Sequence, residues 1–579
     1  MEATLAGIRR RVSAGDLAFA ALLALLALAW QVGRSWLVRP FFYLGADGAN
    51  VASYSAALDH PAAFTADSVL GDPRNFAHYL TIHTPLVRAL ERLTGDYGSA
   101  FVSLLAPHVF VQGLGFFVLG RVLFGSRAWA AFLALIELAP VDLPMWMQWG
   151  MFRDPLARIT LQALLPFLLA ASLAARGAPR RWPWIALGSG LLTYVHPVGA
   201  PVWGAALWLG LWAKRPAGWS RRRQVVSMAG LALGYVAVVL PFAWRFLGGA
   251  SDSAPGAHAV VPLFLPAGYR NVGEALHVLA DAVGVQGLLY GLAALAGVAL
   301  VARLRPADDR ALPMVLLWAL GIGLVALGLP LLDQTLARAR GALPLQYELV
   351  RGLRFFVPLV LLLCLWPLRE LERYFQRRRR RWPARGMLAL GVALSTAWMV
   401  GHPPAEPRAA LACWAQGRFR CVPAHWPDVA EAMAAVRRHV PPGMAMFGTR
   451  EAYPVRLRYG ALRPLVYSDR DLSTLAYRRG PELVTWYRRW REEERVRTRR
   501  RPSERFRAQV EFARSLGARF ALLDRTCLPA PPRGESTPTG REDIVWRNHE
   551  FALVRLDANA HPPDPLESGN AAEAGSHSR

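Results

Sequence analysis

The sequence has 579 residues, of which 54% are hydrophobic, and a formal net charge of +26. A soluble domain is rarely so apolar and so basic at once, so we expect apolar stretches in lipid and basic residues in their connections. The arginines stand in short clusters between apolar runs, which is typical of membrane topology and argues against a nucleic-acid-binding face.

Apolar runs long enough to cross a hydrocarbon core of about 30 Å recur along the chain. We predict eleven spanning helices, at 17–38, 100–122, 128–142, 158–176, 183–197, 198–213, 225–247, 281–302, 312–332, 353–368 and 386–402. The third, fifth and sixth are short, so the number can differ by one or two. Trp30 and Trp36 near the end of the first run and Arg39 directly after it stand where a signal peptide would have small residues, so we interpret the run as an uncleaved helix.

The basic clusters predict the orientation. They stand at Arg9–Arg11, Arg121–Arg127, Arg176–Arg181, Lys214–Arg223, Arg303–Arg310 and Arg377–Arg381. With eleven spans, all of them fall on the side of the N-terminus, which is therefore predicted to be cytoplasmic. The loop 39–99 and everything after 402 are then extracytoplasmic, and we expect the protein in a bacterial inner membrane.

The predicted fold class is an α-helical polytopic membrane protein with a small C-terminal α/β extracytoplasmic domain. The membrane body covers 1–402, including the long first outer loop 39–99, and the soluble domain covers 403–556. In that domain we predict helices at 426–438, 481–499 and 503–516, and strands at 444–447, 464–467, 519–523 and 551–556. The tail 557–579 is rich in Pro, Ala, Ser and Gly and is predicted to be disordered.

The four cysteines suggest no zinc site. Cys413 and Cys421 follow the last predicted span on the oxidising side, and either form a disulfide or are two unrelated thiols. Cys364 lies in a predicted span and is expected to pack there, and Cys527 has no obvious partner.

Asp47 is the first candidate for chemistry. It follows the first span in FFYLGADGANVASY, at the predicted membrane surface. Asp47 or Asn50 could cap a helix that lies along the interface. Alternatively, Asp47 could act as a general base at the boundary of water and lipid. From the residues alone, the capping interpretation is favoured.

A second candidate group stands in MQWGMFRDPLAR, between the third and fourth spans. Asp154 followed by Pro155 is a good helix start, with Asp at the N-cap and Pro in the first turn. That interpretation leaves Arg153 and the nearby Trp146 and Trp149 unexplained, so Arg153 is a candidate ligand of an anion.

A third group is PLQYELVRGLRFF, at the outer entrance of a span. In an α-helix, Tyr347, Arg351 and Arg354 share one face. Arginines that enter lipid usually face a partner or a cavity, and two of them on the outer side suggest an anionic ligand. The alternative is a bridge between Glu348 and Arg351, with Arg354 extending to the interface.

Three further sets of residues each have a structural and a functional interpretation. His196 and Pro197 predict a broken helix, in which His196 either contacts a sugar or phosphate or bonds a carbonyl freed by the kink. His78 and His83 in the first loop are expected to be solvated. Arg456, Arg458 and Arg463 either lean toward the membrane site or, more simply, are ordinary surface charge.

The layout of the chain resembles the GT-C superfamily of polytopic glycosyltransferases. The shared features are a cytoplasmic N-terminus, a large first outer loop with an early acidic residue, about eleven spans and an outer C-terminal domain. The resemblance covers most of the chain in layout and a few residues in motif. It implies a polyprenyl-phosphate-linked sugar as donor, a lipid or glycan acceptor, a surrounding lipid bilayer and no nucleic acid.

The resemblance also implies roles for individual residues. Asp47 in LGADGANVASY matches the acidic residue that activates the acceptor, and Asp154, or else Asp142, is the second acidic residue of the site. The substrate-binding candidates are Arg153, Glu348, Arg351, Arg354 and His196. The common motif has two adjacent acidic residues, whereas Gly48 follows Asp47 here. No cofactor is therefore required and no metal ligand is assigned, although a divalent cation is possible.

The expected reaction is an attack by an acceptor hydroxyl on the anomeric carbon, with inversion and loss of the lipid phosphate. Rival interpretations are a transporter or flippase of lipid-linked glycans, a polysaccharide polymerase or ligase, and a non-catalytic member of the same fold. A transporter typically shows paired or inverted halves and ionisable residues near the bilayer midplane, and the sequence shows neither clearly.

Overall fold

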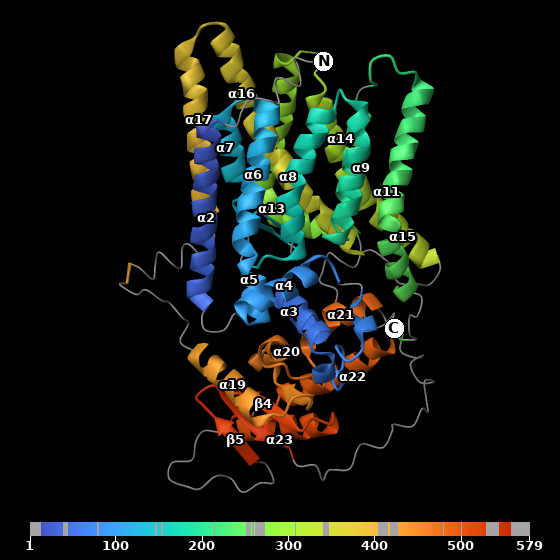
Figure 1. The fold of residues 1–579 in the computed structure, drawn as a ribbon, viewed down its shortest axis with the longest axis vertical. Helices are drawn as coiled ribbons and strands as arrows, with labels where there is room; N and C mark the ends of the chain where they lie inside the picture. Colours follow the sequence, from blue (N-terminus) through green and yellow to red (C-terminus); the bar gives the residue numbers. More distant parts are fainter. Residues whose placement is uncertain are drawn as a thin grey trace. The chain divides into compact units, whose positions relative to one another are not determined.

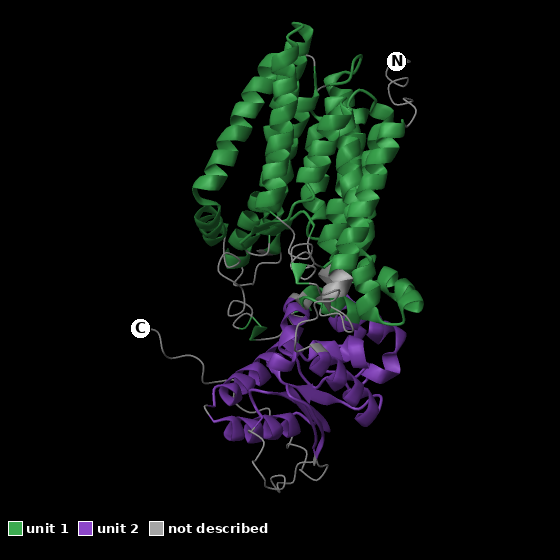
Figure 2. Ribbon diagram, turned by 90° about the vertical axis from the view of Figure 1, so that its left-hand side faces the viewer, with its two compact units in different colours: residues 1–52, 78–423, 478–480 green, residues 53–77, 424–477, 481–579 purple. Residues whose placement is uncertain are grey.

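The computed structural model describes residues 13–38, 44–77, 80–144, 147–151, 154–213, 215–250, 256–257, 260, 272–306, 309–339, 347–402, 415–416, 426–478, 480–499, 501–528 and 543–556. The chain divides into two compact units (Figure 2). Unit 1 comprises residues 1–52, 78–423 and 478–480, and unit 2 comprises residues 53–77, 424–477 and 481–579. Residues 53–77 of the first loop, expected in the membrane body, thus group with the C-terminal region. Cys413, Cys421 and the tail 557–579 lie outside the described residues.

Unit 1 is built from helices that run side by side (Figure 1). Its helices are α2 (Ala14–Val38), the start of α3 (Ala46–Asp59), α4 (His83–Thr94), α5 (Tyr97–Ser103), α6 (Leu105–Phe124), α7 (Arg127–Ile136), α8 (Ala157–Ala175), α9 (Trp182–Leu191), α10 (Ala200–Leu211), α11 (Arg221–Ala250), α13 (Val272–Leu304), α14 (Ala311–Gly323), α15 (Leu329–Ala339), α16 (Phe356–Arg377) and α17 (Arg381–Gly401). Shorter elements are the 3-10 helices η4 (Pro179–Arg181), η5 (Leu192–Tyr194) and η7 (Tyr347–Phe355), the π-helical turn η6 (Leu324–Gly328), and the antiparallel strands β1 (Val141–Leu143) and β2 (Met147–Trp149).

By length and composition, eight helices in the described part of the chain can cross a membrane. They are Ala14–Gly33, Tyr97–Phe124, Ala157–Ala175, Arg221–Arg245, Val272–Leu304, Ala311–Ala339, Glu348–Arg377 and Arg381–Gly401. The expected class, a helical membrane protein, is confirmed. The predicted spans at 128–142, 183–197 and 198–213 correspond to the shorter helices α7, α9 and α10, so the number eleven stays a prediction.

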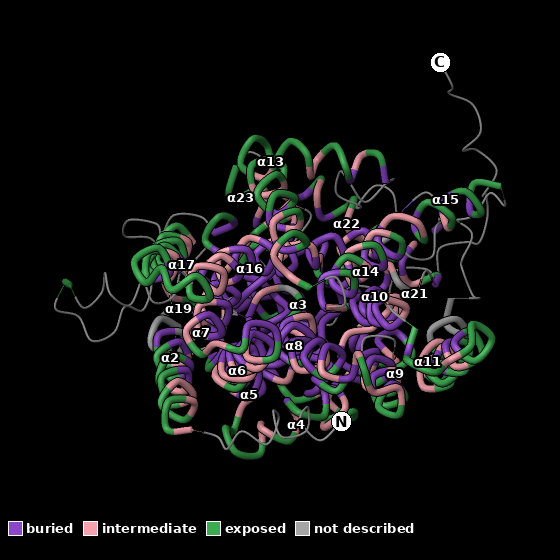
Figure 3. The backbone as a smooth tube through the Cα atoms, turned by 90° about the horizontal axis from the view of Figure 1, so that it is seen from above, coloured by how far each residue is buried: buried purple, intermediate pink, exposed green. Residues whose placement is uncertain are grey.

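Burial separates a central set of helices from a peripheral set. In the span that contains α16, 72% of the most apolar stretch is buried, whereas the corresponding share is 6% for α11 and 17% for α2, α13 and α17. In Figure 3, α6, α8, α10 and α16 are drawn largely in purple, whereas α11 and α17 are largely green. Apolar helices that expose so much of their surface are suited to contact with lipid.

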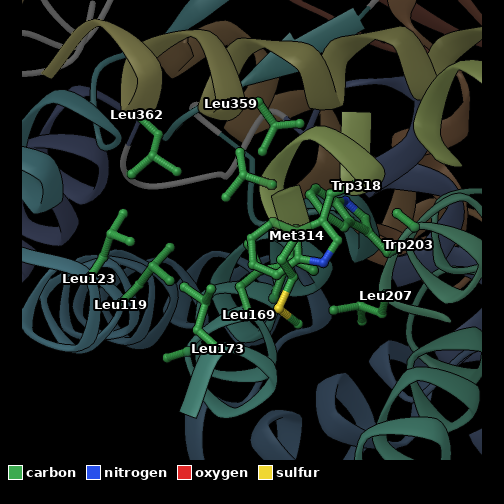
Figure 4. Close-up of a cluster of buried hydrophobic side chains, with 14 of the residues drawn as sticks. Leu119, Leu123, Leu169, Leu173, Trp203, Leu207, Met314, Trp318, Leu359 and Leu362 are labelled. Atoms are coloured by element: carbon green, nitrogen blue, oxygen red, sulfur yellow. The ribbon is translucent and has the colours of Figure 1, made fainter. Parts of the chain in front are cut away.

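The centre of unit 1 is closely packed rather than merely apolar. Leucines of α6 and α8 belong to one buried cluster with Trp203, Met314 and Trp318 (Figure 4). Lipid tails are as apolar as leucine, so helices in a membrane associate through close packing at small residues. A Cβ at Gly120 would lie 2.6 Å from the Cα of Ala130, and a Cβ at Gly321 would lie 2.5 Å from the Cα of Ala206. These glycines allow α6 to approach α7, and α14 to approach α10.

Arginines from several segments of the chain lie at one end of unit 1. Asp16, at the start of α2, pairs with Arg121 and Arg127 at 3.9 and 3.3 Å. The side chain of Arg305 donates to the carbonyl oxygen of Leu123, and that of Arg369 donates to the carbonyl oxygen of Phe124. These bonds satisfy carbonyl groups at the C-terminus of α6 that have no partner within the helix.

Unit 2 contains a four-stranded sheet with the strand order β3-β4-β6-β5. The strands are β3 (Met446–Gly448), β4 (Phe520–Asp524), β5 (Asp543–Arg547) and β6 (Phe551–Arg555), and β3 pairs with β4 in parallel while the other pairs are antiparallel. The helical elements are η1 (Pro61–Phe64), η2 (Pro73–Asn75), α19 (Trp426–His439), η8 (Arg450–Ala452), α20 (Val455–Ala461), η9 (Asp469–Asp471), α21 (Leu472–Arg478), α22 (Pro481–Arg497) and α23 (Pro502–Ser515).

Most predicted elements of this region are present in the structure, with two differences. The predicted strand at 464–467 forms only an isolated bridge between Leu465 and Met446, and β5 was not predicted. The β5 strand, DIVWR, has little hydrophobic alternation and only five residues, so its pairing with β6 depends on tertiary contacts.

A buried ion-pair network joins residues 53–77 to the rest of unit 2. The side chains of Asp67, Arg458 and Asp471 are 0%, 3% and 3% exposed, and Arg458 contacts both carboxylates. Asp67 also accepts hydrogen bonds from the backbone N–H groups of Val69, Leu70 and Leu465. This pairing of the first loop with the C-terminal region explains why residues 53–77 belong to unit 2.

The interpretation of three arginines in this region as surface charge is wrong, because Arg456, Arg458 and Arg463 are all buried inside unit 2. Arg456 donates to the carbonyl oxygen of Tyr453 at 3.2 Å, and Arg463 donates to that of Val440 at 2.8 Å. A guanidinium group has five N–H donors, which allows it to satisfy several backbone carbonyl groups at once.

Candidate functional site

Asp47 lies in the first turn of α3 and keeps 48% of its side chain exposed. Because α3 begins at Ala46, neither Asp47 nor Asn50 occupies its N-cap, and the capping interpretation is wrong. The helix dipole nevertheless favours a carboxylate in the first turn. Oδ2 of Asp47 lies 3.4 Å from Nη1 of Arg158.

Arg158 is a site residue that the sequence reasoning did not single out. It stands in the first turn of α8, and only 13% of its side chain is exposed. Its Nη1 faces Asp47, while its Nη2 donates to Oε1 of Gln148 in β2 at 2.8 Å. The sequence pattern that could have identified Arg158 is an arginine in the first turn of an otherwise apolar helix. A charge at such a position is energetically costly unless it has partners.

Asp154 binds the backbone that precedes α3 and does not cap α8. The N-cap of α8 is Leu156, so the predicted capping by Asp154 is wrong. Instead, Oδ2 of Asp154 accepts a hydrogen bond of 2.7 Å from the backbone N–H of Gly45. A Cβ at Gly45 would lie 2.5 Å from that oxygen, so the close approach requires glycine. This contact holds the residues that lead into α3, and hence Asp47.

The segment with the paired arginines differs from the expected helix. Residues 347–355 form the 3-10 helix η7, in which side chains three apart align. Glu348, Arg351 and Arg354 therefore share a face, and the segment is not the α-helix that was expected. The side chain of Tyr347 lies outside the described residues.

The charges on η7 are largely shielded from solvent. Nη1 of Arg351 lies 3.4 Å from Oε1 of Glu348, as one interpretation expected. Arg354 is only 2% exposed, so the alternative in which it extends to the interface is wrong. Its guanidinium carbon lies 5.0 Å from the ring centre of Phe355.

His196 lies in the break between η5 and α10 and is partly exposed. Its Nδ1 accepts a hydrogen bond of 2.9 Å from the backbone N–H of Gly199, so it does not bond a freed carbonyl through that atom. An accepting Nδ1 carries no proton, so the neutral ring carries its proton on Nε2. His196 can therefore present an N–H donor.

These residues converge on one place in unit 1. Arg158 interacts electrostatically with Asp47, Asp154, Glu348 and Arg351. His196 interacts in the same way with Arg158, Arg351 and Arg354. We call the set Asp47, Asp154, Arg158, His196, Glu348, Arg351 and Arg354 the polar site. It joins four segments of the chain: the start of α3, the start of α8 with the residues before it, the break before α10, and η7.

Two other candidates are not placed in the polar site. Arg153 and the nearby Trp146 lie outside the described residues. Asp142 is exposed on β1, opposite Gln148 in the hairpin.

His83 is fully buried, so the expectation that it is solvated is wrong. Its Nε2 lies 2.5 Å from the carbonyl oxygen of Pro155, which makes Nε2 the donor. The hydroxyl of Thr160 lies 3.2 Å from Nδ1 of His83 and 2.7 Å from Nε2 of His108. This chain of hydrogen bonds supports the backbone next to Asp154. His78, the other loop histidine, lies outside the described residues.

Among the described residues, the one group of three side chains close enough to share a metal ion is in unit 2. It consists of Asp428, His549 and Glu550, whose ligand atoms lie within 4.8 Å of one another. Glu550 also pairs with Arg525 at 3.5 Å, which competes with a cation for the carboxylate. The described residues of the polar site contain no comparable group.

No protein-family model matches the sequence, and no curated protein matches it at a significant level.

Proposed function

We propose that unit 1 is a glycosyltransferase that transfers a sugar from a polyprenyl-phosphate carrier to a hydroxyl group of a lipid or glycan. The observation that carries the proposal is the polar site, in which one exposed carboxylate, Asp47, lies beside Arg158 in the same charged cluster as Arg351 and Arg354. A donor with an apolar chain, a phosphate and a sugar fits a site where arginines gather at the end of an apolar helix bundle.

The distribution of contacts suggests a role for each carboxylate. Asp154 is engaged by the backbone of Gly45, and Glu348 by Arg351. Asp47 is the one with nearly half its side chain exposed, so it is the carboxylate that an acceptor can reach. We assign Asp47 as the general base.

The reaction balances with these groups alone. The acceptor oxygen forms a bond to the anomeric carbon, and its proton passes to Asp47. The bond between that carbon and the phosphate oxygen breaks, and polyprenyl phosphate leaves with the electron pair. Arg158, Arg351 and Arg354 stabilise the phosphate as its charge grows, because guanidinium groups donate two parallel hydrogen bonds to phosphate oxygens. His196 supplies a further N–H donor for the sugar or phosphate.

The place of the polar site favours a transferase over a transporter. Its residues stand at the starts of α3 and α8, in the break before α10 and in η7, which directly precedes α16. A transporter is expected to hold its ionisable substrate-binding residues near the bilayer midplane instead. With the orientation predicted from the arginine clusters, the polar site faces the extracytoplasmic side of a bacterial inner membrane.

The proposal is tested by sugar transfer with the purified full-length protein and a panel of polyprenyl-phosphate sugars. Asp47→Asn is expected to lower the rate by about 10²- to 10⁴-fold, the usual contribution of a general base. The matched control is Asp281→Asn in α13, whose carboxylate is 68% exposed and pairs with His277, and it is expected to keep full activity.

Other outcomes point to the rival functions. Full activity of Asp47→Asn would show that Asp47 is not the base. Movement of labelled donor across vesicle membranes without transfer would support a flippase. Joining of preassembled glycan chains would support a polymerase or ligase, and no activity of any kind would support a non-catalytic member.

A further inference from the structure

We propose that a groove between α9 and α11 binds an anionic phospholipid of the surrounding bilayer, with an acyl chain in the groove and the phosphate at its arginine-rich end. The groove has a volume of about 490 Å³, within the range of about 300–1,000 Å³ typical of sites for small organic ligands. Its walls include Trp182, Leu187, Trp219 and Val238. None of these residues belongs to the polar site.

Two glycines keep the groove open. Gly230 and Gly234 are one turn apart on α11, and a Cβ at either would meet no atom within 4 Å. Beside them, Trp184 and Leu233 are each 70% exposed. Only 6% of the most apolar stretch of α11 is buried, so this side of unit 1 is suited to face hydrocarbon. An acyl chain from the bilayer is the occupant that such a surface accepts.

The positive charge of arginines at one end of the groove favours a lipid with an anionic headgroup. Arg180 and Arg181 directly precede Trp182, and Arg221–Arg223 begin α11. The guanidinium of Arg223 lies 4.9 Å from the ring centre of Trp219, which packs edge-on against Trp182. From residue 155 to residue 251 the sequence contains no Asp or Glu. These arginines therefore have no acidic neighbours along this part of the chain, and an anionic headgroup complements them.

The acyl-chain half of the proposal is tested by filling the groove. The purified full-length protein is heated in detergent with added phosphatidylglycerol or with phosphatidylcholine of the same chains. Phosphatidylglycerol is expected to raise the melting temperature and to remain bound in native mass spectrometry, and phosphatidylcholine is not. Gly230→Leu with Gly234→Leu is expected to abolish both effects. Leucine favours the helix more than glycine does, so α11 should still form.

Gly291→Leu in α13 is the matched control, because a Cβ there also meets no atom within 4 Å. It should keep the full response to phosphatidylglycerol. Equal responses in the groove-filled and control variants would overturn the groove as the site.

The role of the arginines in binding the headgroup is tested by Arg223→Gln. This variant is expected to bind phosphatidylglycerol about fivefold more weakly, the usual effect of one arginine near an anionic lipid surface. The control is Arg385→Gln, since Arg385 likewise lies over a tryptophan, Trp382, at 5.9 Å. An equal response of wild type to both lipids, or an equal loss in both arginine variants, would overturn the choice of an anionic lipid.

Discussion

The carboxylate of Asp154 accepts a hydrogen bond from the backbone N–H of Gly45 across 109 residues of sequence. Through this contact, the residues before α8 hold the chain where it enters α3, two residues before Asp47. The arrangement resembles the support that catalytic groups generally need, because a displacement of about 1 Å can cost a large factor in rate.

This contact predicts the effect of a single methyl group. In Gly45→Ala, the Cβ would lie 2.5 Å from Oδ2 of Asp154, so either the carboxylate or the entry to α3 must move. We expect sugar transfer to fall at least about tenfold while the protein remains monodisperse. Gly177→Ala is the control, because a Cβ at Gly177 meets no atom within 4 Å.

The same contact predicts a difference between two changes at Asp154. Asp154→Asn keeps an oxygen that can accept from Gly45, whereas Asp154→Ala does not. We therefore expect the amide variant to retain much more activity than the alanine variant. Equal activities of the two, measured in the same transfer assay, would mean that the hydrogen bond does not position Asp47.

Arg158 is expected to be irreplaceable by lysine. Its two terminal nitrogens reach Asp47 and Gln148 separately, and a lysine ammonium group cannot reproduce this fork. Arg158→Lys should lower transfer by at least about tenfold and weaken the binding of polyprenyl phosphate. Arg385→Lys, at an exposed position, should leave both unchanged. Wild-type binding by Arg158→Lys would remove Arg158 from the phosphate site.

The ion-pair network of unit 2 should be important for stability. Arg458→Met leaves the carboxylates of Asp67 and Asp471 buried without their cation, which typically costs about 3–5 kcal/mol. We expect faster hydrogen exchange in the peptides around Asp67 and Asp471 in the full-length protein. The control is Arg74→Met, which breaks the exposed pair with Asp72 in the same loop and should leave exchange elsewhere unchanged.

Glu493 predicts a pH dependence of unit 2. Burial raises the pKa of Glu493 to about 7 from an ordinary value of 4.5, and the hydrogen bond from Tyr467 opposes this only in part. The folded state then binds the proton more tightly than the unfolded state. The stabilisation is complete below pH 4.5 and is lost as the pH rises through about 7, a change of about 3 kcal/mol.

Glu493→Gln should remove this part of the dependence of stability on pH, which is measured by hydrogen exchange of unit 2 at several pH values. Asp469 and Glu451 reinforce the rise in the pKa of Glu493 and Arg450 opposes it, and these groups remain in the variant. Glu492→Gln is the control, because Glu492 is half exposed and pairs with Arg495. An unchanged slope in Glu493→Gln would show that another group titrates.

Much of the fold could be predicted because its signals are local. Long apolar runs predicted the spanning helices, and amphipathic or charged segments predicted α19, α22 and α23 within a few residues. The arginine clusters were expected on one side, and contacts of Arg121, Arg127 and Arg305 bring several of them to one end of unit 1. The lengths of α7, α9 and α10 were less predictable, because where a helix stops depends on its neighbours.

The sequence by itself determined that this is a helical membrane protein, because hydropathy and helix length are properties of each segment alone. It also identified residues that have either a structural or a functional role, namely Asp47, Asp154, His196, Arg351 and Arg354. Only the tertiary structure decided which of them meet.

A contact between residues 100 or more positions apart cannot be predicted from the neighbouring sequence. Three such contacts were therefore identified only in the folded structure. Asp154 accepts a hydrogen bond from Gly45 where a helix cap was predicted, and Arg158 forms an ion pair with Asp47. Asp67 of the first loop forms a buried ion pair with Arg458. In each case the neighbouring sequence either suggested a local role for the charged side chain or gave no reason to select it, and its partner lies on a distant segment. The physical reason is that a buried charge must be paired, however far along the chain the partner lies.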